Sequence, residues 1–100
     1  MIEIEVREDL IYIHGHAGAA PRGFSVPCEA VTVLCNVLAG SMHEITKQPE
    51  KIMIFEPGKV LFNRKGLNAE SELLFKSFLL GLEMVSDAYS KYITMNVTKL

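Results

Sequence analysis

Apolar and polar residues alternate at the start of the chain and predict two short strands. Residues 2–6 read Ile-Glu-Ile-Glu-Val, which is the two-residue period of a strand with one buried face. A charged turn at 7–9 leads to residues 10–14, where β-branched and aromatic side chains gather. We expect these two strands to pair as a hairpin.

The apolar period then lengthens to three or four residues, which predicts two helices. One runs from Pro27 to about Thr46 and the other from about Ala69 to Lys91. Pro27 suits the first helical position because its missing N–H would be unpaired there anyway, and Ser25 is a nearby cap. The periodic apolar residues of the first helix are Val31, Leu34, Cys35, Leu38, Met42 and Ile45.

Three further strands are expected between and after the helices. Residues 51–55 and 59–63 flank Glu56-Pro57-Gly58, a strong turn signal, and 93–98 close the chain. The predicted order is therefore β-β-α-β-β-α-β. The simplest arrangement is a two-layer α+β fold, in which two helices cover one face of a mixed, mostly antiparallel five-stranded sheet.

Length and composition are those of one soluble globular domain spanning residues 1–100. The chain is 49% hydrophobic and 22% charged, which is enough apolar material for a core. Its formal net charge of -2 offers no broad basic field, so direct nucleic-acid binding is not expected. We find no signal peptide and no apolar run near the roughly 18 residues of a membrane span, and we expect a cytoplasmic protein with no membrane partner and no cofactor.

The second helix is more apolar than its place on a small sheet requires. Its charged residues Glu72, Lys76, Glu83 and Asp87 share one narrow sector, and apolar side chains cover most of the remainder. A surface helix needs an apolar stripe only a little over about 100° wide. We therefore predict a homodimer that uses part of this helix. The alternative is a central helix held between the sheet and the first helix.

The two cysteines, Cys28 and Cys35, are predicted to lie on the first helix. Seven residues of helix place their Cα atoms about 10.5 Å apart, whereas a disulfide needs roughly 7 Å or less. The same distance makes it hard for one zinc ion to bind both sulfurs at about 2.3 Å. A disulfide and a zinc site that uses both sulfurs are thus disfavoured, and in the cytoplasm both thiols are expected to stay reduced.

Cys28 falls in the first turn of that helix, where chemistry favours a reactive thiol. The helix dipole and the unpaired N–H groups stabilise a thiolate, whereas the adjacent Glu29 opposes it. His16 lies twelve residues upstream on a glycine-rich loop. If the loop folds back, this imidazole would take the thiol proton and later protonate a leaving amine, while the helix N–H groups stabilise an oxyanion.

Taken alone, a cysteine near a helix start is more often a small buried residue than a nucleophile. For Cys35, deeper in the helix, we expect the core. His14 at the strand end is expected to be structural or partly exposed, and His43 to lie on a solvated helical face.

A longer motif favours the catalytic interpretation. The chain resembles the ribosomal-processing cysteine protease family, Prp, which pairs a Gly-His-Ala motif with a helix-start cysteine twelve residues later. The resemblance extends to chain length and element order. The matching residues are His14-Gly15-His16-Ala17-Gly18, Gly23 and Val26-Pro27-Cys28-Glu29-Ala30-Val31-Thr32.

This resemblance implies a homodimeric bacterial enzyme that removes a short N-terminal extension from a large-subunit ribosomal protein. Cys28 would be the nucleophile and His16 the general base and acid, with the loop ordering over the substrate peptide. Candidate loop and substrate-binding residues are Gly15, Ala17, Gly18, Gly23, Phe24, Ser25 and Thr32.

The chain also departs from the family pattern around the cysteine. Many members carry an acidic residue where this chain has Ser25, so the group that orients His16 is unidentified. Val, Ala and Ser are frequent where Pro27, Glu29 and Thr32 stand. Thr32 keeps a hydroxyl one helical turn from Cys28.

Two other classes of function stay open from the residues alone. The run Gly15-His16-Ala17-Gly18 is a G-x-x-G sequence, which in one RNA-binding fold clamps the nucleic-acid backbone, so ribosome or RNA association without cleavage is the main alternative. Arg22 is the only basic residue in that loop, which counts against it. Metal binding through His14, His16 and Cys28 lacks a fourth ligand, and we predict no metal site.

Overall fold

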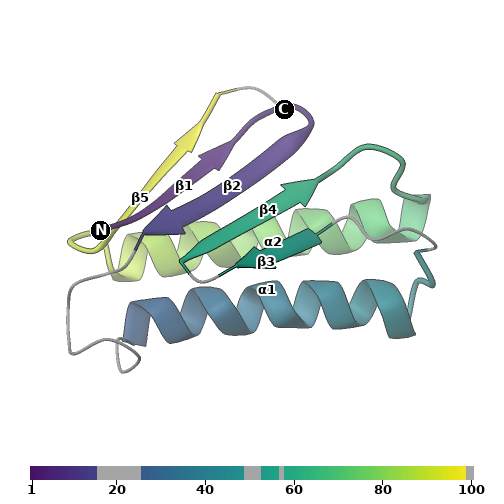
Figure 1. Ribbon diagram of the computed structural model, residues 1–100, viewed down its shortest axis with the longest axis horizontal. Helices are drawn as coiled ribbons and strands as arrows, with labels where there is room; N and C mark the ends of the chain where they lie inside the picture. The colour runs from purple at the N-terminus through teal and green to yellow at the C-terminus, as the bar shows by residue number, and fades with distance from the viewer. Residues whose placement is uncertain (16–25, 49–52, 57, 99–100) are drawn as a thin grey trace.

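The computed structural model describes residues 1–15, 26–48, 53–56 and 58–98. Within them the elements follow the predicted order (Figure 1). The first helix begins one residue before its predicted start and both helices end two or three residues early, whereas the strands are close to their predicted ranges. The elements are β1 (Ile2–Val6), β2 (Leu10–Gly15), α1 (Val26–Glu44), β3 (Met53–Glu56), β4 (Lys59–Asn63), α2 (Ala69–Ala88) and β5 (Ile93–Val97).

The strands form one sheet in the order β3-β4-β2-β1-β5. The predicted hairpin is present, because β1 and β2 are antiparallel, and β2–β4 and β3–β4 are antiparallel as well. Only the β1–β5 pairing is parallel among the described strands, since the chain reaches β5 by crossing along α2. The α+β prediction with a mixed, mostly antiparallel sheet is confirmed.

Both helices lie side by side against one face of the sheet (Figure 1). Alternation along β1 and β2 sends one set of side chains toward the helices and the other set to the open face. Phe62 of β4 stacks on Phe75 of α2 with ring centroids 5.5 Å apart. The side chains that fill the space between the layers include Ile4, Val6, Ile11, Ile13, Val31, Cys35, Leu38, Phe62, Phe75 and Leu82.

The C-terminal end of α1 corrects one expectation. Ile45 follows the apolar period but is 70% exposed, because the helix ends at Glu44 and the chain turns. Lys47 adopts a positive φ of 53°, and the Gln48 N–H donates to the Met42 carbonyl at 2.7 Å. Thr46 is buried instead, and its hydroxyl bonds that of Ser71 at 2.6 Å.

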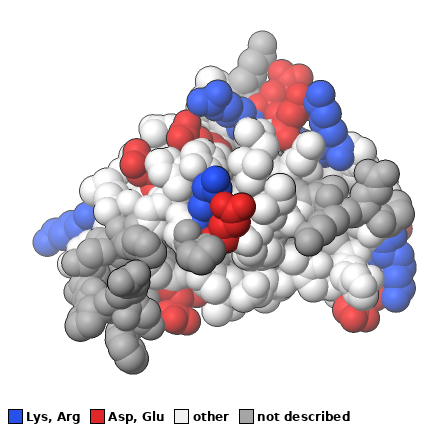
Figure 2. Space-filling model, viewed as in Figure 1, with Lys and Arg blue, Asp and Glu red and all other residues white. Residues whose placement is uncertain are grey.

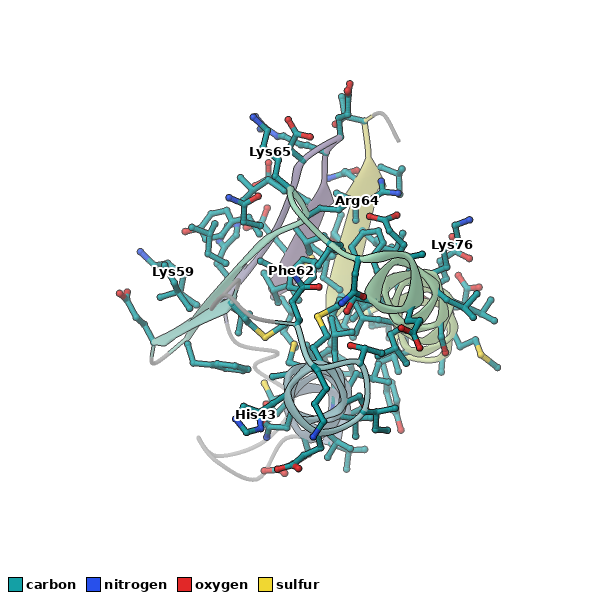
Figure 3. All side chains as sticks on the ribbon, turned by 90° about the vertical axis from the view of Figure 1, so that its right-hand side faces the viewer. His43, Lys59, Phe62, Arg64, Lys65 and Lys76 are labelled. Carbon is teal, nitrogen blue, oxygen red and sulfur yellow. The ribbon has the colours of Figure 1, made fainter. Side chains whose placement is uncertain are left out.

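The N-terminal end of α2 is held by side chains of its first two turns and of the segment that precedes it. Asn68 is the N-cap, and its side-chain oxygen accepts from the Ser71 N–H at 2.8 Å. Arg64 donates to the Glu72 carboxylate at 3.1 and 3.4 Å, and its guanidinium lies 4.5 Å from the Phe75 ring centroid (Figure 3). These contacts fix the end of the molecule opposite to the start of α1.

Part of the apolar surface predicted on α2 stays uncovered. Because α2 lies beside α1 rather than between it and the sheet, the outer side of the helical layer carries large exposed apolar residues. On the face shown in Figure 2, the described basic side chains are scattered, several of them beside acidic ones, and they form no broad basic patch. The exposed apolar residues of the two helices are Val26, Val33, Val37, Leu73, Leu80 and Met84.

Candidate active site

Cys28 lies in the first turn of α1, as predicted, and is half-buried. Val26 begins the helix and Pro27 packs into the core, so the cysteine is the third helical residue. The first-turn N–H groups of a helix have no partners within the helix, and the dipole there favours negative charge. The neighbouring Glu29 is an exposed acidic group in the same turn. The position is therefore suited to a thiolate, with one charge opposing it.

Cys35 lies two turns further along and has the opposite character. It is 0% exposed, and burial raises the pKa of its thiol to about 12. Neither cysteine is in a disulfide. The prediction that Cys35 belongs to the core is confirmed, and Cys28 is the only one of the two thiols that solvent reaches.

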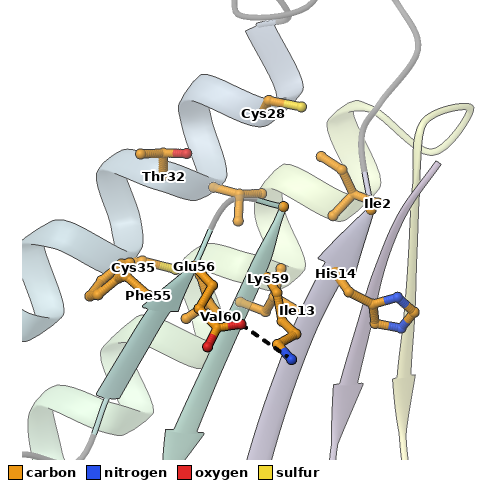
Figure 4. A pocket seen from close by; sticks show the side chains of 13 residues that line it. Ile2, Ile13, His14, Cys28, Thr32, Cys35, Phe55, Glu56, Lys59 and Val60 are labelled. Carbon is orange, nitrogen blue, oxygen red and sulfur yellow. Dashed lines mark ion pairs between the residues drawn. The ribbon is translucent and has the colours of Figure 1, made fainter.

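Cys28 borders a pocket of about 260 Å³ between α1 and the sheet (Figure 4). Thr32, one turn after Cys28, is exposed and lines the same pocket. Side chains from β1, β2, β3 and β4 complete the lining, which is mostly apolar. Its further side chains include Ile2, Ile13, Val31, Cys35, Phe55 and Val60.

Gly15 ends β2 beside this pocket, one residue later than the predicted strand end. Its φ of +97° is a left-handed conformation, and an added Cβ would overlap the carbonyl oxygen of Met1. Its N–H donates to the Gly58 carbonyl at 3.0 Å. Only glycine fits this position, and the turn between β3 and β4 holds the chain where it leaves the sheet toward His16.

His14 points away from Cys28, toward the open face of the sheet (Figure 4). Its Nε2 lies 3.3 Å from a Glu5 carboxylate oxygen, and its ring stacks on Tyr12 at 4.5 Å. Hydrogen bonds from Arg7 and His14 hold the pKa of Glu5 below its ordinary value. His14 is thus structural and partly exposed, as expected.

A metal site that uses both His14 and Cys28 finds no support in this arrangement. The two side chains lie on opposite sides of β2. In the described part of the chain, no group of three or more His, Cys, Asp or Glu side chains is placed to hold a metal ion. His43 has a side chain 83% exposed beside Glu44, which is the solvated position expected for it.

Several predicted site residues lie outside the described residues. The structure places Gly15, Cys28 and Thr32 around one pocket. The remaining predicted residues, outside the described ranges, are His16, Ala17, Gly18, Gly23, Phe24 and Ser25.

The hairpin formed by β3 and β4 adds residues that the sequence analysis did not assign to the site. Phe55, Glu56, Lys59 and Val60 all line the pocket, and Glu56 and Lys59 form an ion pair at 3.4 Å. The sequence signals the turn between these strands but carries no sign that the turn lies next to Cys28. That proximity follows from the position of β3 and β4 beside β2.

Comparisons with known proteins give one family and several similar folds. The profile described as cysteine protease Prp matches residues 1–94. No curated protein matches the chain significantly. In the described residues, no helix is long and apolar enough to cross a membrane.

The similar solved structures cover nearly the whole chain. The ribosomal processing protease Prp from S. aureus, in complex with a covalently linked product peptide, is 16% identical with a TM-score of 0.85, covering 98% of this chain and 100% of that chain. The same protease with a substrate peptide is 15% identical, with a TM-score of 0.77 and 97% of each chain covered. SMU.848 from Streptococcus mutans is 21% identical, with a TM-score of 0.76, covering 99% of this chain and 93% of that chain. At these identities, the likeness establishes a shared fold.

Proposed function

This chain belongs to the cysteine protease Prp family, and on that premise we propose that it removes a short N-terminal extension from a large-subunit ribosomal protein. Membership makes it a cysteine protease, a hydrolase that acts on peptide bonds. The S. aureus structures of a ribosomal processing protease with substrate and product peptides support the choice of substrate. We assign the reaction to residues 1–100 as one domain, acting in the cytoplasm, where its thiols stay reduced.

The placement of Cys28 is the observation that carries this proposal. Of the two thiols, this one is half-exposed, lies in the first turn of α1 and borders the pocket. A reactive cysteine needs solvent access and surroundings that stabilise a thiolate, whereas Cys35 is fully buried. Cys28 is therefore assigned as the nucleophile.

His16 is proposed as the general base and acid, on the family motif alone. Its imidazole takes the proton from the Cys28 Sγ, and the thiolate attacks the carbonyl carbon of the scissile bond. The first-turn N–H groups of α1 stabilise the oxyanion that forms. The C–N bond then breaks as the imidazolium protonates the leaving amine, which leaves a thioester.

Water completes the cycle. With its proton taken by His16, the water oxygen attacks the thioester carbonyl, and the peptide acid leaves as the thiol is restored. Thr32 is proposed to bond to groups at the site through its hydroxyl, since it lines the same pocket as Cys28. The other proposed loop residues, which bind the substrate backbone, are Gly15, Ala17, Gly18, Gly23, Phe24 and Ser25.

The test is cleavage of a peptide that spans the extended N-terminus of the cognate ribosomal protein. We expect the wild-type protein to cleave it, the folded Cys28→Ala variant to be inactive, and Cys35→Ala to retain activity. His16→Ala should lose about 10²–10⁴-fold in rate, as expected for removal of a general base. Cleavage by folded Cys28→Ala would contradict the assignment, and binding of the peptide without cleavage would favour a non-catalytic ribosome-associated role.

We also propose that two copies associate through the outer side of the helical layer. Leu73, Leu80 and Met84 of α2 are 58–70% exposed, and Val33 and Val37 of α1 are 56% and 59% exposed. Neighbouring exposed apolar side chains are frequent at protein interfaces. The homodimer remains a proposal that oligomeric-state measurements test.

A further inference from the structure

Phe55 occupies an unusual position on the edge strand β3. It pairs with Val60 of β4, and alternation places it on the same side of the sheet as Met53. Met53 is 6% exposed, whereas Phe55 is 46% exposed. Among the described strands none lies outside β3, so a large aromatic ring on the helix-facing side remains open to solvent.

The exposed ring borders the pocket next to Cys28. Phe55 lies toward α1 in Figure 4, and it lines the same pocket as Cys28 and Cys35. At about 260 Å³ this space is below the common range of about 300–1,000 Å³ for small-molecule sites, which suits one large side chain. The floor is apolar, with Ile13 and Val31 among its residues.

The charged side chains nearest this pocket face the other side of the sheet. Alternation along β3 puts Glu56 on the open face with Ile54, and Lys59 of β4 pairs with Glu56 and with His14. The ion pair between Glu56 Oε1 and Lys59 Nζ, at 3.4 Å, therefore lies on the open face (Figure 4). The helix-facing lining of the pocket is apolar and favours an apolar side chain over an acidic or basic one, because an unpaired charge would lose its hydration there.

We propose that Phe55 determines specificity by forming one wall of the subsite that receives the side chain next to the scissile bond. The inference rests on the proposed function, because Cys28 must be the attacking group for this pocket to be a substrate site. A large apolar side chain, aliphatic or aromatic, packs against the Phe55 ring and covers the surface that is now exposed. Phe55 selects substrate and does not take part in bond breaking.

The experiment uses the full chain and three peptidyl chloromethyl ketones that differ only in their last residue, which is leucine, phenylalanine or alanine. In each reaction the Cys28 sulfur displaces chloride. The second-order rate constant is measured, and iodoacetamide reports the reactivity of the thiol itself. We expect the leucine and phenylalanine reagents to react about tenfold faster than the alanine reagent. Phe55→Ala should bring the three rates together and leave the iodoacetamide rate unchanged.

Ile54→Ala is the matched control, since Ile54 is 50% exposed on the same strand but faces the open side of the sheet. It should keep the wild-type preference, and Phe55→Leu should restore most of it. A wild-type protein that alkylates Cys28 without preference, or an equal loss in Ile54→Ala, overturns the role of Phe55 and leaves the protease assignment intact. Slow, equal labelling of Cys28 and Cys35 by iodoacetamide overturns both.

Discussion

Gly15 has a constrained backbone conformation and directly precedes His16, the proposed general base. The left-handed φ of +97°, the proximity of the Met1 carbonyl and the hydrogen bond to Gly58 all act on the residue directly before His16. Cys28 and Cys35, seven residues apart, differ in solvent exposure, because one lies at a helix start and the other in the core. At this scale, burial and backbone conformation decide what each residue type does.

We expect Gly15→Ala to lose stability and activity together. The added Cβ overlaps the Met1 carbonyl oxygen and forces a strained φ, at a cost of about 1–3 kcal/mol in the free energy of unfolding. Urea titration and peptide cleavage measure the two effects. The control is Gly40→Ala, whose Cβ would meet no atom within 4 Å and which should gain about 0.5–1 kcal/mol. An unchanged Gly15→Ala protein would show that this backbone geometry is not needed.

Labelling with iodoacetamide at alkaline pH should distinguish the two thiols. Because burial raises the pKa of Cys35 to about 12, its thiol stays protonated in the folded protein at pH 9, and iodoacetamide should label Cys28 alone. Cys35 should react only after urea is added. Mass spectrometry of peptic fragments identifies the labelled residue, and fast labelling of Cys35 in the folded protein would contradict its burial.

The same shift predicts a loss of stability at high pH. The unfolded chain releases the Cys35 proton near the ordinary value of 9.0, whereas the folded chain holds it until about 12. The unfolded state therefore binds fewer protons between these values, and the contribution of Cys35 to the free energy of unfolding falls as pH rises from 9 to 12. Urea midpoints measured from pH 8 to pH 11 should fall more for the wild-type protein than for Cys35→Ala. Equal dependence of the urea midpoint on pH in the two proteins would contradict the raised pKa of Cys35.

At the scale of elements, the two ends of the helical layer have different roles. The start of α1 carries Cys28, while the end of α1 and the start of α2 are tied by the Thr46–Ser71 hydroxyl pair and by Asn68. Asn68 caps α2 through its side-chain oxygen, and its amide donates to the Thr46 carbonyl at 3.2 Å. The end that contains Thr46, Asn68 and Ser71 therefore stabilises the fold, and the opposite end carries the proposed nucleophile.

Asn68→Ala should destabilise the fold and spare the reaction. It removes the cap of α2, which is worth about 0.5–2 kcal/mol, together with the bond to Thr46. The urea midpoint should fall, while the cleavage rate under folding conditions stays at the wild-type value. Asn36→Ala is the matched control, because Asn36 is exposed within α1 and alanine favours helix. A cleavage rate that falls along with the urea midpoint would contradict the prediction, because it would show that the cap of α2 affects the site at Cys28.

At the scale of the whole molecule, two layers leave two surfaces uncovered. The open face of the sheet is mixed, with Glu3, Glu5, Tyr12 and His14 among its residues. The outer side of the helices is more apolar, and covering it would remove Leu73, Leu80 and Met84 from water. This difference favours the helical side as the surface between two copies.

We expect the chain to behave in solution as twice its mass of 11.1 kDa. Leu80→Lys combined with Met84→Lys should give the monomer, because two charges would have to lose their hydration in the interface. Light scattering coupled to gel filtration measures the mass. Ile54→Lys changes a residue on the open face that is 50% exposed, against 58% for Leu80 and 65% for Met84, and should leave the dimer intact. A monomeric wild type would overturn the proposal. If only Ile54→Lys gave a monomer, the interface would lie on the open face of the sheet instead.

The sequence by itself determined the elements and the positions of both cysteines on α1. Hydrophobic periods of two and of three to four residues depend on local geometry, so they predicted the order β-β-α-β-β-α-β and the first-turn place of Cys28. The same pattern misplaced Ile45, because the period continues past Glu44 while the left-handed Lys47 turns the chain. Local patterns report a helix face more reliably than a helix end.

Only the tertiary structure decided what surrounds Cys28. The pocket lies between α1 and the β3–β4 hairpin, which begins more than twenty residues after Cys28, and the sheet order puts β4 next to β2. No periodicity encodes that Phe55 lines the same pocket as Cys28 or that the Gly58 carbonyl accepts from the Gly15 N–H. Such contacts join residues far apart in the chain, and they form because the apolar faces of the sheet and the helices are buried together.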